Sequence, residues 1–294
     1  MNVAVLLPGD LRIRDKNHLN QLQHYLKGCS IYTSTYHNYI DLAKTLSGNY
    51  MVTSSPPCPE STAENNTGER LYQWYHLQVI IDSYKHVLAQ HDMVVKLRPD
   101  LICLSDSSAT LKQALEQQNI EQYLYTNSDR LFYAKSKLFL TTFDNIFTDI
   151  KYIHMDQKNM LNINYKNIIK TDINYYPVHH YSSSICSRFE WLPFPRHVCN
   201  TPPPDSFWPG IVKSKQKKRQ MHTWKQNLIT NLIRNDEYDT SDLVNMDRPT
   251  PNHPRAFSSE KYFTIHCLRY APMKIGHVYG QINKNRYRFN YGSR

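Results

Sequence analysis

Residues 92–102 (DMVVKLRPDLI) place a cation and an acid directly after an apolar run. The run Met93–Leu97 is typical of a buried strand, and Arg98, Pro99 and Asp100 follow it. Arginine offers a planar fork of donors that fits phosphate oxygens, and aspartate can accept ribose hydroxyls or bind a divalent ion. The pattern favours a binding site for a phosphorylated ligand at a strand end, although a salt bridge between two loops would use the same residues.

Two further polar sets follow apolar runs in the same way. Residues 8–12 (PGDLR) follow Val3–Leu7, and residues 127–129 (NSD) follow Tyr123–Thr126. Gly9 has no Cβ, so a ligand can approach the backbone closely there. The polarity of ordinary loops explains each set taken alone. Three sets meeting at one sheet edge would form a cleft of mixed charge, which suits a phosphorylated ligand.

The rest of the chain supplies the elements that would position these sets. Short apolar or β-branched runs predict strands over residues 3–7, 30–35, 51–53, 93–97, 123–126, 131–134 and 273–279. Apolar spacings of three and four predict helices over residues 17–28 (with Asn17 as N-cap), 39–46, 67–88, 111–118, 138–150 and 260–270. This alternation predicts an α/β fold, with a mostly parallel sheet, helices on both faces and ligands at the carboxyl ends of the strands.

The chain shows no strong domain boundary, so we expect one domain over residues 1–294. A ligand-binding core would occupy residues 1–150. Residues 151–255, which are rich in Asn, Tyr and Pro, would form an irregular insertion. Residues 256–294 would add a helix, a strand and a basic tail.

Charge and cysteine content indicate the setting in which the protein works. A net charge of +10 and an isoelectric point near 9.2 favour an anionic partner, although a merely basic protein has the same composition. The six cysteines show no Cys-x-x-Cys spacing, so neither a zinc site nor a redox pair is expected. No run approaches the ~20 apolar residues of a membrane span, and the start is not typical of a signal peptide. We therefore expect a cytoplasmic protein.

Several enzyme classes lack their sequence signatures here. Glycine-rich phosphate loops of the Walker or dinucleotide type are absent, and residues 182–184 (SSS) lack a nucleophile elbow. The 14 histidines, including the pair His179 and His180, give no metal-binding pattern. Kinase, dehydrogenase and hydrolase functions are therefore disfavoured.

Five stretches of the chain, in order, carry a resemblance to a known family: VAVLLPGDLR, LYQWYHLQVIIDSY, DMVVKLRPDLI, NSDRLFYAKSKLF and SSEKYFTIHCLRYAPMKI. The chain resembles bacterial polysaccharide-synthesis proteins of the WavE type and related glycosyltransferase-like proteins. The most specific part is KLRPDL with the downstream SDRLFYAKS. Residues 151–255 have no counterpart in the resemblance.

The resemblance implies a glycosyltransferase of the GT-A type, which binds a nucleotide sugar on a Rossmann-like α/β domain and builds a surface glycan such as lipopolysaccharide or capsule. Gly9, Arg12, Arg98 and Asp100 are then the expected donor-binding residues. Most GT-A enzymes hold a divalent metal, Mg²⁺ or Mn²⁺, on the diphosphate with an Asp-x-Asp motif. This chain has no such motif and carries residues 98–100 (RPD) at the matching place. Metal dependence is therefore doubtful; Asp100 is the candidate ligand, and Arg98 would supply positive charge instead.

The resemblance also places two acids, Asp129 and Glu260, where a general base could deprotonate the acceptor hydroxyl. Glu260 opens a helix within a segment so apolar that the helix must be buried, which would hold its start rigidly. Glu260 is therefore slightly ahead of Asp129 for an inverting enzyme, and a retaining enzyme would need neither. As a first-turn acid, Glu260 would in any case stabilise its helix by roughly 0.3–1 kcal/mol.

Two other kinds of function stay open. The tail NKNRYRFNYGSR interleaves basic and aromatic residues, and residues 213–219 form a second basic run. Such segments can bind nucleic acid or lie against an anionic membrane, and membrane contact would suit a transferase with a lipid-linked acceptor. A catalytically silent protein of the same fold is the other alternative.

Overall fold

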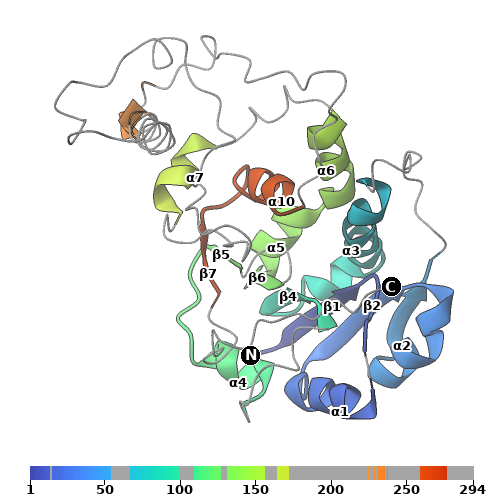
Figure 1. Ribbon diagram of the computed structural model, residues 1–294. Helices are drawn as coiled ribbons and strands as arrows, with labels where there is room; N and C mark the ends of the chain where they lie inside the picture. The colour runs from blue at the N-terminus through green and yellow to red at the C-terminus, as the bar shows by residue number, and fades with distance from the viewer. Residues whose placement is uncertain are drawn as a thin grey trace, which may run out of the picture.

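The computed structural model describes residues 1–13, 15–53, 67–99, 109–126, 131–155, 164–171 and 259–276, with a few residues between 224 and 237. Figure 1 shows these residues as a twisted sheet with helices on both sides. Most of the expected insertion over residues 151–255 lies outside the described part, as does the basic tail.

The described residues form a seven-stranded sheet with the order β3-β2-β1-β4-β6-β5-β7. The strands are β1 (Val3–Pro8), β2 (Ser30–Thr35), β3 (Asn49–Val52), β4 (Met93–Leu97), β5 (Leu124–Thr126), β6 (Leu131–Lys135) and β7 (Met273–Ile275). β6 pairs antiparallel with its two neighbours, β4 and β5, and all other pairs are parallel. All strands except β6 therefore point in one direction, and their carboxyl ends share one edge of the sheet.

The two central strands are buried on both sides because helices cover both faces of the sheet, and Lys96 of β4 is their one residue that is not apolar. Every residue of β1 and β4 is buried. Their register pairs Val3 with Met93 and Leu6 with Lys96. Continuous apolar runs are typical of parallel strands that are covered on both faces, and this is why both strands could be predicted from the sequence.

One face of the sheet is covered by the helices α3 (Thr67–Leu88), α5 (Ser136–Phe143), α6 (Ile146–Met155) and α10 (Ser259–Cys267) (Figure 1). Trp74 of α3 is fully buried in this layer. Its ring stacks on Phe263 of α10, with centroids 5.5 Å apart, and on Phe132 of β6 at 6.4 Å. The centroids of Phe132 and Phe263 lie 4.7 Å apart. Three aromatic rings from α3, β6 and α10 thus form the centre of this layer.

The opposite face is covered by α1 (Lys16–Tyr25), α2 (Ile40–Leu46) and α4 (Leu111–Glu116), with a 3-10 turn, η1 (His37–Tyr39), leading into α2. Each α-helix buries a leucine against the sheet, namely Leu22, Leu46 and Leu115. Asp15 caps α1 by accepting a hydrogen bond from the backbone N–H of His18 at 2.8 Å. The expectation that Asn17 caps this helix was therefore wrong, because the N-cap lies two residues earlier, at Asp15.

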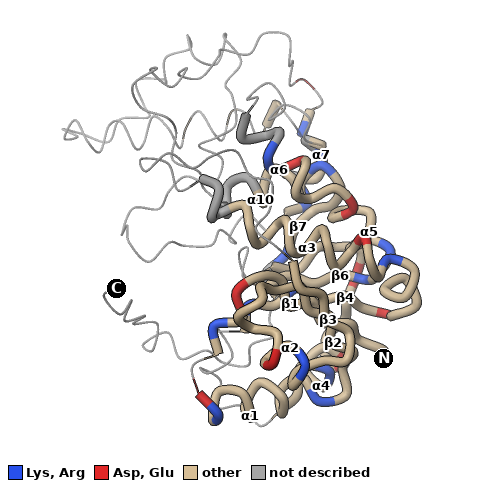
Figure 2. Tube along the Cα trace, turned by 90° about the vertical axis from the view of Figure 1, so that its right-hand side faces the viewer, with Lys and Arg blue, Asp and Glu red and all other residues tan. Residues whose placement is uncertain are grey.

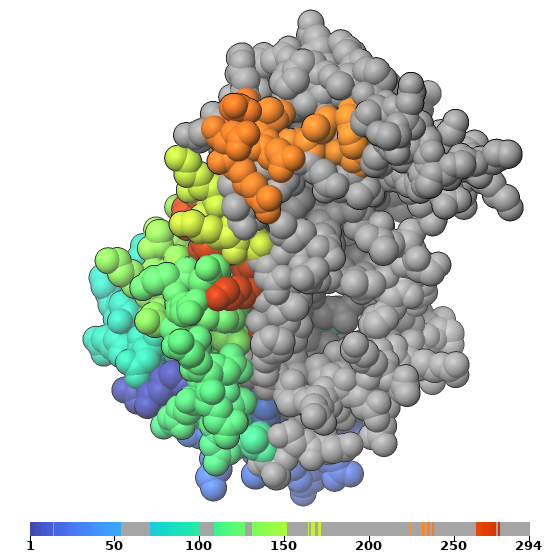
Figure 3. Space-filling model, turned by 90° about the vertical axis from the view of Figure 1, so that its left-hand side faces the viewer, coloured from blue at the N-terminus to red at the C-terminus, as the bar shows by residue number. Residues whose placement is uncertain are grey.

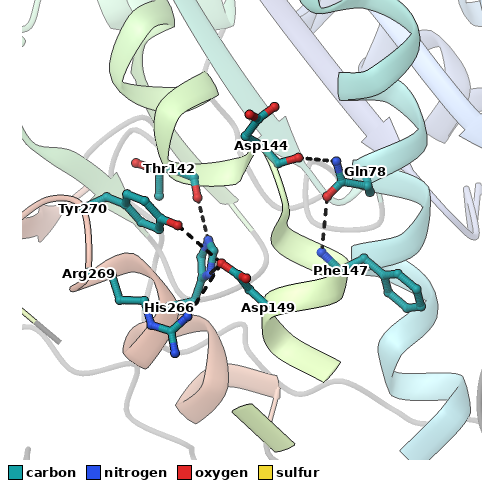
Figure 4. Close-up of polar contacts among 8 residues, drawn as sticks. All are labelled: Gln78, Thr142, Asp144, Phe147, Asp149, His266, Arg269 and Tyr270. Atoms are coloured by element: carbon teal, nitrogen blue, oxygen red, sulfur yellow. Dashed lines mark hydrogen bonds and ion pairs between the residues drawn. The ribbon is translucent and has the colours of Figure 1, made fainter. Parts of the chain in front are cut away.

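The single helix expected over residues 138–150 is two helices, α5 and α6. Asp144 and Asn145 separate them, and both residue types favour helix ends over helix interiors. The side-chain amide of Gln78 on α3 donates a hydrogen bond to the carbonyl O of Asp144 (Figure 4). The amide oxygen of Gln78 accepts from the backbone N–H of Phe147 at 3.4 Å. A tertiary contact therefore stabilises a break that the apolar spacing did not predict.

Within the expected insertion, the helix α7 (Tyr165–Lys170) lies against the last strand. The side-chain amide of Asn167 donates to the carbonyl O of Leu268 at 2.9 Å, and the backbone N–H of Met273 donates to Thr171 Oγ1 at 3.1 Å. Figure 3 shows the corresponding face, where residues 109–126 (green), 164–171 (yellow) and 259–276 (red) adjoin one another.

The prediction of an α/β fold with a mostly parallel sheet and helices on both faces is confirmed. The antiparallel direction of β6 was not predicted. None of the described helices combines the length and the apolar character needed to cross a lipid bilayer.

The aromatic centre of the α3 layer predicts a large loss of stability when Trp74 is truncated. We expect Trp74→Ala to lower the free energy of unfolding by about 3–5 kcal/mol, because it leaves a cavity between two ring faces. Urea denaturation followed by circular dichroism measures this change. Val87→Ala is the matched control on the same helix, since Val87 is 43% exposed, and it should change the free energy by less than about 0.5 kcal/mol. Equal effects of the two variants would contradict the central role of Trp74.

Candidate functional site

The strand order reverses between β1 and β4. From β1 the chain moves outward through β2 and β3, and it then places β4 on the other side of β1. In open α/β sheets, the loops that follow the two strands at such a reversal diverge and leave room for a ligand. The segments that follow β1 and β4 begin two of the three polar sets predicted to bind a ligand. β5 ends and β6 begins at the same edge, so the third set connects to this edge as well.

Residues 9–12 form a turn that is bonded to the neighbouring strand. Gly9 has a φ of 87°, in the left-handed region that glycine adopts without steric cost. Its N–H donates to the carbonyl O of Ser34 at 2.7 Å, and its carbonyl O accepts from Thr35 Oγ1 at 2.7 Å. A Cβ at this position would lie 3.7 Å from the His76 ring. The positive φ therefore favours glycine at this turn, although a Cβ would fit beside α3, and the polar groups of Gly9 bond to β2.

Arg12 lies at the surface of this turn and has a φ of 44°, which is uncommon for a residue other than glycine. Its Nε lies 3.0 Å from Oδ2 of Asp10, and its backbone N–H donates to Oδ1 of the same carboxylate at 3.2 Å. The side chain of Arg12 is 55% exposed, so this ion pair contributes little to stability. A hydrogen bond to Asp10, together with burial, raises the pKa of Tyr39 to about 12. The turn thus presents a guanidinium at the carboxyl edge, beside a carboxylate that also binds Tyr39.

Arg98 directly follows β4 and is partly exposed. The next residue, Pro99, is buried, and its carbonyl O accepts a hydrogen bond from Nε2 of His18 at 3.0 Å. Because a carbonyl oxygen only accepts, His18 carries a proton on Nε2. α1 therefore fixes the backbone just beyond Arg98. Asp100 and Asp129, the other predicted residues of the site loops, lie outside the described part.

A buried polar cluster lies beneath this edge, on the α3 side of the sheet. Nδ1 of His76 lies 2.8 Å from Ser34 Oγ and 3.3 Å from Thr53 Oγ1. The ring of Tyr36 meets the His76 ring edge-on, with centroids 4.5 Å apart. Nε2 of His76 has no hydrogen-bond partner among the described residues. Burial lowers the pKa of His76 to about 4, so the ring is neutral at pH 7.

Lys96 is a fully buried cation on the same face. Its Nζ lies 3.4 Å from Oε1 of Gln73, and 5.8 Å and 5.4 Å from the ring centroids of Trp74 and Phe132. The negative faces of aromatic rings attract an ammonium group, and this attraction offsets part of the cost of burying the charge. A lysine inside an apolar strand is a signal that could have identified this residue from the sequence. His76 gave a weaker signal, since histidines are common on the buried faces of helices.

Glu260 lies in the first turn of α10, and its side chain lies outside the described part. α10 precedes β7 in the chain. One turn after Glu260, Phe263 stacks on Trp74 and Phe132, the two rings beside which Lys96 Nζ lies. The middle of α10 therefore packs close to Lys96 of β4.

No model of a known protein family matches this sequence, and none of the curated proteins matches it. In the part of the chain that the structure describes, no group of three or more His, Cys, Asp or Glu residues could hold a metal ion. The proposed metal ligand Asp100 lies outside that part, so a metal at this position stays a prediction.

The burial of His76 predicts a specific dependence of stability on pH. Its pKa is about 4 in the folded protein and 6.5 in the unfolded chain, so the unfolded chain binds a proton first as the pH falls. The free energy of unfolding should therefore decrease between pH 6.5 and pH 4, with a contribution from His76 of about 3 kcal/mol. Urea denaturation at pH 7, 5.5 and 4.5 measures the slope.

His76→Gln should have a shallower slope than the parent protein over this pH range, because glutamine does not titrate. His86→Gln is the matched control, because His86 is exposed on the same helix, and it should keep the parental slope. A parental slope in His76→Gln would show that His76 does not stay neutral in the folded protein.

Proposed function

We propose that the protein is a glycosyltransferase of the GT-A type that moves a sugar from a nucleotide-sugar donor to a surface glycan, of the lipopolysaccharide or capsule kind. The observation that carries the proposal is the reversal of strand order between β1 and β4, with Gly9, Arg12 and Arg98 on the segments that follow these strands. Ligands of open α/β sheets bind at such reversals. The assignment to sugar transfer itself rests on the family resemblance of the sequence.

The donor diphosphate would lie across the ends of β1 and β4. Arg98 and Arg12 would bind its oxygens, and the buried ammonium of Lys96 would add positive potential from behind the strand ends. Asp100 would orient the sugar or hold a Mg²⁺ or Mn²⁺ ion. Positive charge at this place stabilises the nucleotide leaving group as the bond between the sugar and the phosphate oxygen breaks.

The second substrate is a glycan or glycolipid whose hydroxyl attacks the anomeric carbon of the donor sugar. Glu260, or Asp129 in its place, would accept the proton of that hydroxyl as the new glycosidic bond forms. The packing of Phe263, one turn after Glu260, on Trp74 and Phe132 beside Lys96 supports Glu260 as the first choice.

A lipid-linked acceptor would bring the protein to an anionic membrane surface, which its net charge of +10 favours. Figure 2 shows Lys and Arg positions interspersed with Asp and Glu positions along the described helices. The basic runs at residues 213–219 and 284–294 lie outside the described part. Nucleic-acid binding is therefore the alternative. Tight, salt-sensitive binding of RNA, together with no binding to anionic vesicles, would favour it.

A bidentate role for Arg98 predicts that Arg98→Lys weakens donor binding although the charge is kept. We expect the Kd of the bound nucleotide to rise about tenfold, because the loss of one charge-assisted hydrogen bond costs roughly 1.5 kcal/mol. Saturation-transfer NMR with a panel of common nucleotide sugars identifies the donor, and calorimetry then measures its Kd. Arg234→Lys, at an exposed arginine elsewhere in the chain, is the control and should bind like the parent.

Two results of this experiment would count against different parts of the proposal. Failure of every nucleotide sugar to bind would contradict the function. Binding that Arg98→Lys and Asp100→Asn leave unchanged would show that residues 98–100 are structural and do not contact the donor.

A general-base role predicts that Glu260→Gln folds and binds donor but transfers sugar at least about 100-fold more slowly, because the amide cannot accept the proton. Turnover with the identified donor and acceptor measures the rate. Glu116→Gln is the control, since Glu116 is exposed on α4, and it should keep the parental rate. A parental rate in Glu260→Gln would exclude Glu260, and Asp129→Asn would then be the decisive variant for an inverting enzyme.

A further inference from the structure

The last turn of α10 is joined to α5 and α6 through one buried side chain, His266 (Figure 4). Nε2 of His266 lies 2.6 Å from the carbonyl O of Thr142 on α5. Nδ1 lies 3.3 Å from Oδ2 of Asp149 on α6, which is an ion-pair distance, although the alignment of the two atoms is not that of a hydrogen bond. The His266 side chain is fully buried, so these two groups take the place of water around the ring.

The two contacts constrain the protons of this ring. A backbone carbonyl oxygen only accepts, so Nε2 must carry a proton. If Nδ1 carried none, its lone pair would face an oxygen of Asp149 inside the protein. That arrangement is repulsive when Asp149 is a carboxylate, and it becomes favourable only if Asp149 is protonated.

The surroundings of Asp149 favour the carboxylate. Nη1 of Arg269 lies 3.7 Å from Oδ2, and the hydroxyl of Tyr270 donates to the same oxygen at 3.4 Å. The Asp149 side chain is 25% exposed, so water also reaches the carboxylate. Burial raises the pKa of Asp149, but the groups around it lower the pKa below its ordinary value. Asp144, at the end of α5, adds a further negative charge near Tyr270. A carboxylate at Asp149 requires a proton on Nδ1 for a favourable contact.

We propose that His266 is an imidazolium that forms a partly buried ion pair with Asp149, and that this pair is a positioning device for α10. The charged and titratable groups that face it are Asp149 of α6, Asp144 at the end of α5, and Arg269 and Tyr270, which follow α10. The imidazolium donates from Nε2 to the Thr142 carbonyl on α5 and places its charge beside the Asp149 carboxylate on α6, and these two contacts restrict the rotation of α10 about its own axis.

The functional consequence rests on the proposed function. α10 carries Glu260 in its first turn and His266 in its last turn, and Phe263 between them packs into the aromatic centre. A helix of nine residues held at its last turn and its middle presents its first turn in one orientation. His266 is therefore a positioning residue for the proposed general base, and it touches neither donor nor acceptor.

The ring protons can be observed directly, whether or not the protein transfers sugar. Long-range ¹H–¹⁵N NMR of the parent protein at pH 7 should show the ¹⁵N shifts of an imidazolium at both ring nitrogens of one histidine. His266→Gln should remove that signal. A neutral ring with its proton on Nε2 alone would overturn the proposal. The measurement is made on the parent protein, and His266→Gln serves only to assign the signal.

A double-mutant cycle tests the ion pair itself. His266→Gln keeps a donor for the Thr142 carbonyl and removes the charge, while Asp149→Asn removes the opposite charge. Each change should raise the unfolding equilibrium constant about tenfold or more, and the double variant should be little worse than either alone. The exposed pair of Lys274 and Glu121, 2.8 Å apart, is the control and should show almost no coupling. Additive effects of the two buried changes would contradict the pair.

The positioning role is separated from the proposed function by a third measurement. In an active transferase, His266→Gln should lower kcat at least tenfold with the donor Kd unchanged, because the donor binds at β1 and β4. A parental kcat in folded His266→Gln would refute the positioning role alone. Absence of any transferase activity in the parent would refute the proposed function, while the NMR result and the cycle would still decide the ion pair.

Discussion

The close contact between α3 and the first strand is the constraint on which the rest of the described structure depends. Ala4 and Leu6 of β1 are buried in one cluster with Trp74 of α3, and Nδ1 of His76 lies 2.8 Å from Ser34 Oγ on the neighbouring strand. This contact places Gln73 and His76 at the carboxyl edge of the sheet and Trp74 in the centre of the layer. The position of α3 on the sheet therefore determines both the packing of the core and the polar side chains at the carboxyl edge.

The same face of the sheet buries ionisable groups in different ways. Lys96 lies against two aromatic rings and the amide of Gln73. His76 sits between hydroxyl groups, and burial keeps it neutral at pH 7. His266 faces a carbonyl oxygen and a carboxylate, which favour its charged form. Each environment follows from the groups that surround the side chain, and none can be deduced from residue type alone.

Much of the fold could be predicted from the sequence because its signals are local. The uninterrupted apolar run of Val3–Leu7 predicted a central strand, and the spacing from Leu71 to Leu88 predicted a long helix. The antiparallel direction of β6 and the break between α5 and α6 could not be predicted, since both depend on contacts with distant segments such as the one between Gln78 and Asp144.

The candidate site was predictable to a smaller degree. Gly9, Arg12 and Arg98 were identified because polar residues directly follow apolar runs, and strand direction brings those strand ends to one edge. His76 and Lys96 lie within a regular helix and a regular strand, where the sequence shows only a polar residue in an apolar pattern. Their proximity to the site depends on strand order, which a single sequence does not contain.

The antiparallel direction of β6 also determines where α5 lies on the sheet. Because β6 runs antiparallel between β4 and β5, α5 begins at the amino ends of the parallel strands, where the Ser136 N–H donates to the carbonyl O of Asp92 at 3.2 Å. α5 then passes along the sheet and offers the Thr142 carbonyl to α10 partway up that face. A parallel β6 would start α5 at the opposite edge, and His266 would lose this partner. The reversal of one strand is therefore a condition for the contact between α5 and the last turn of α10.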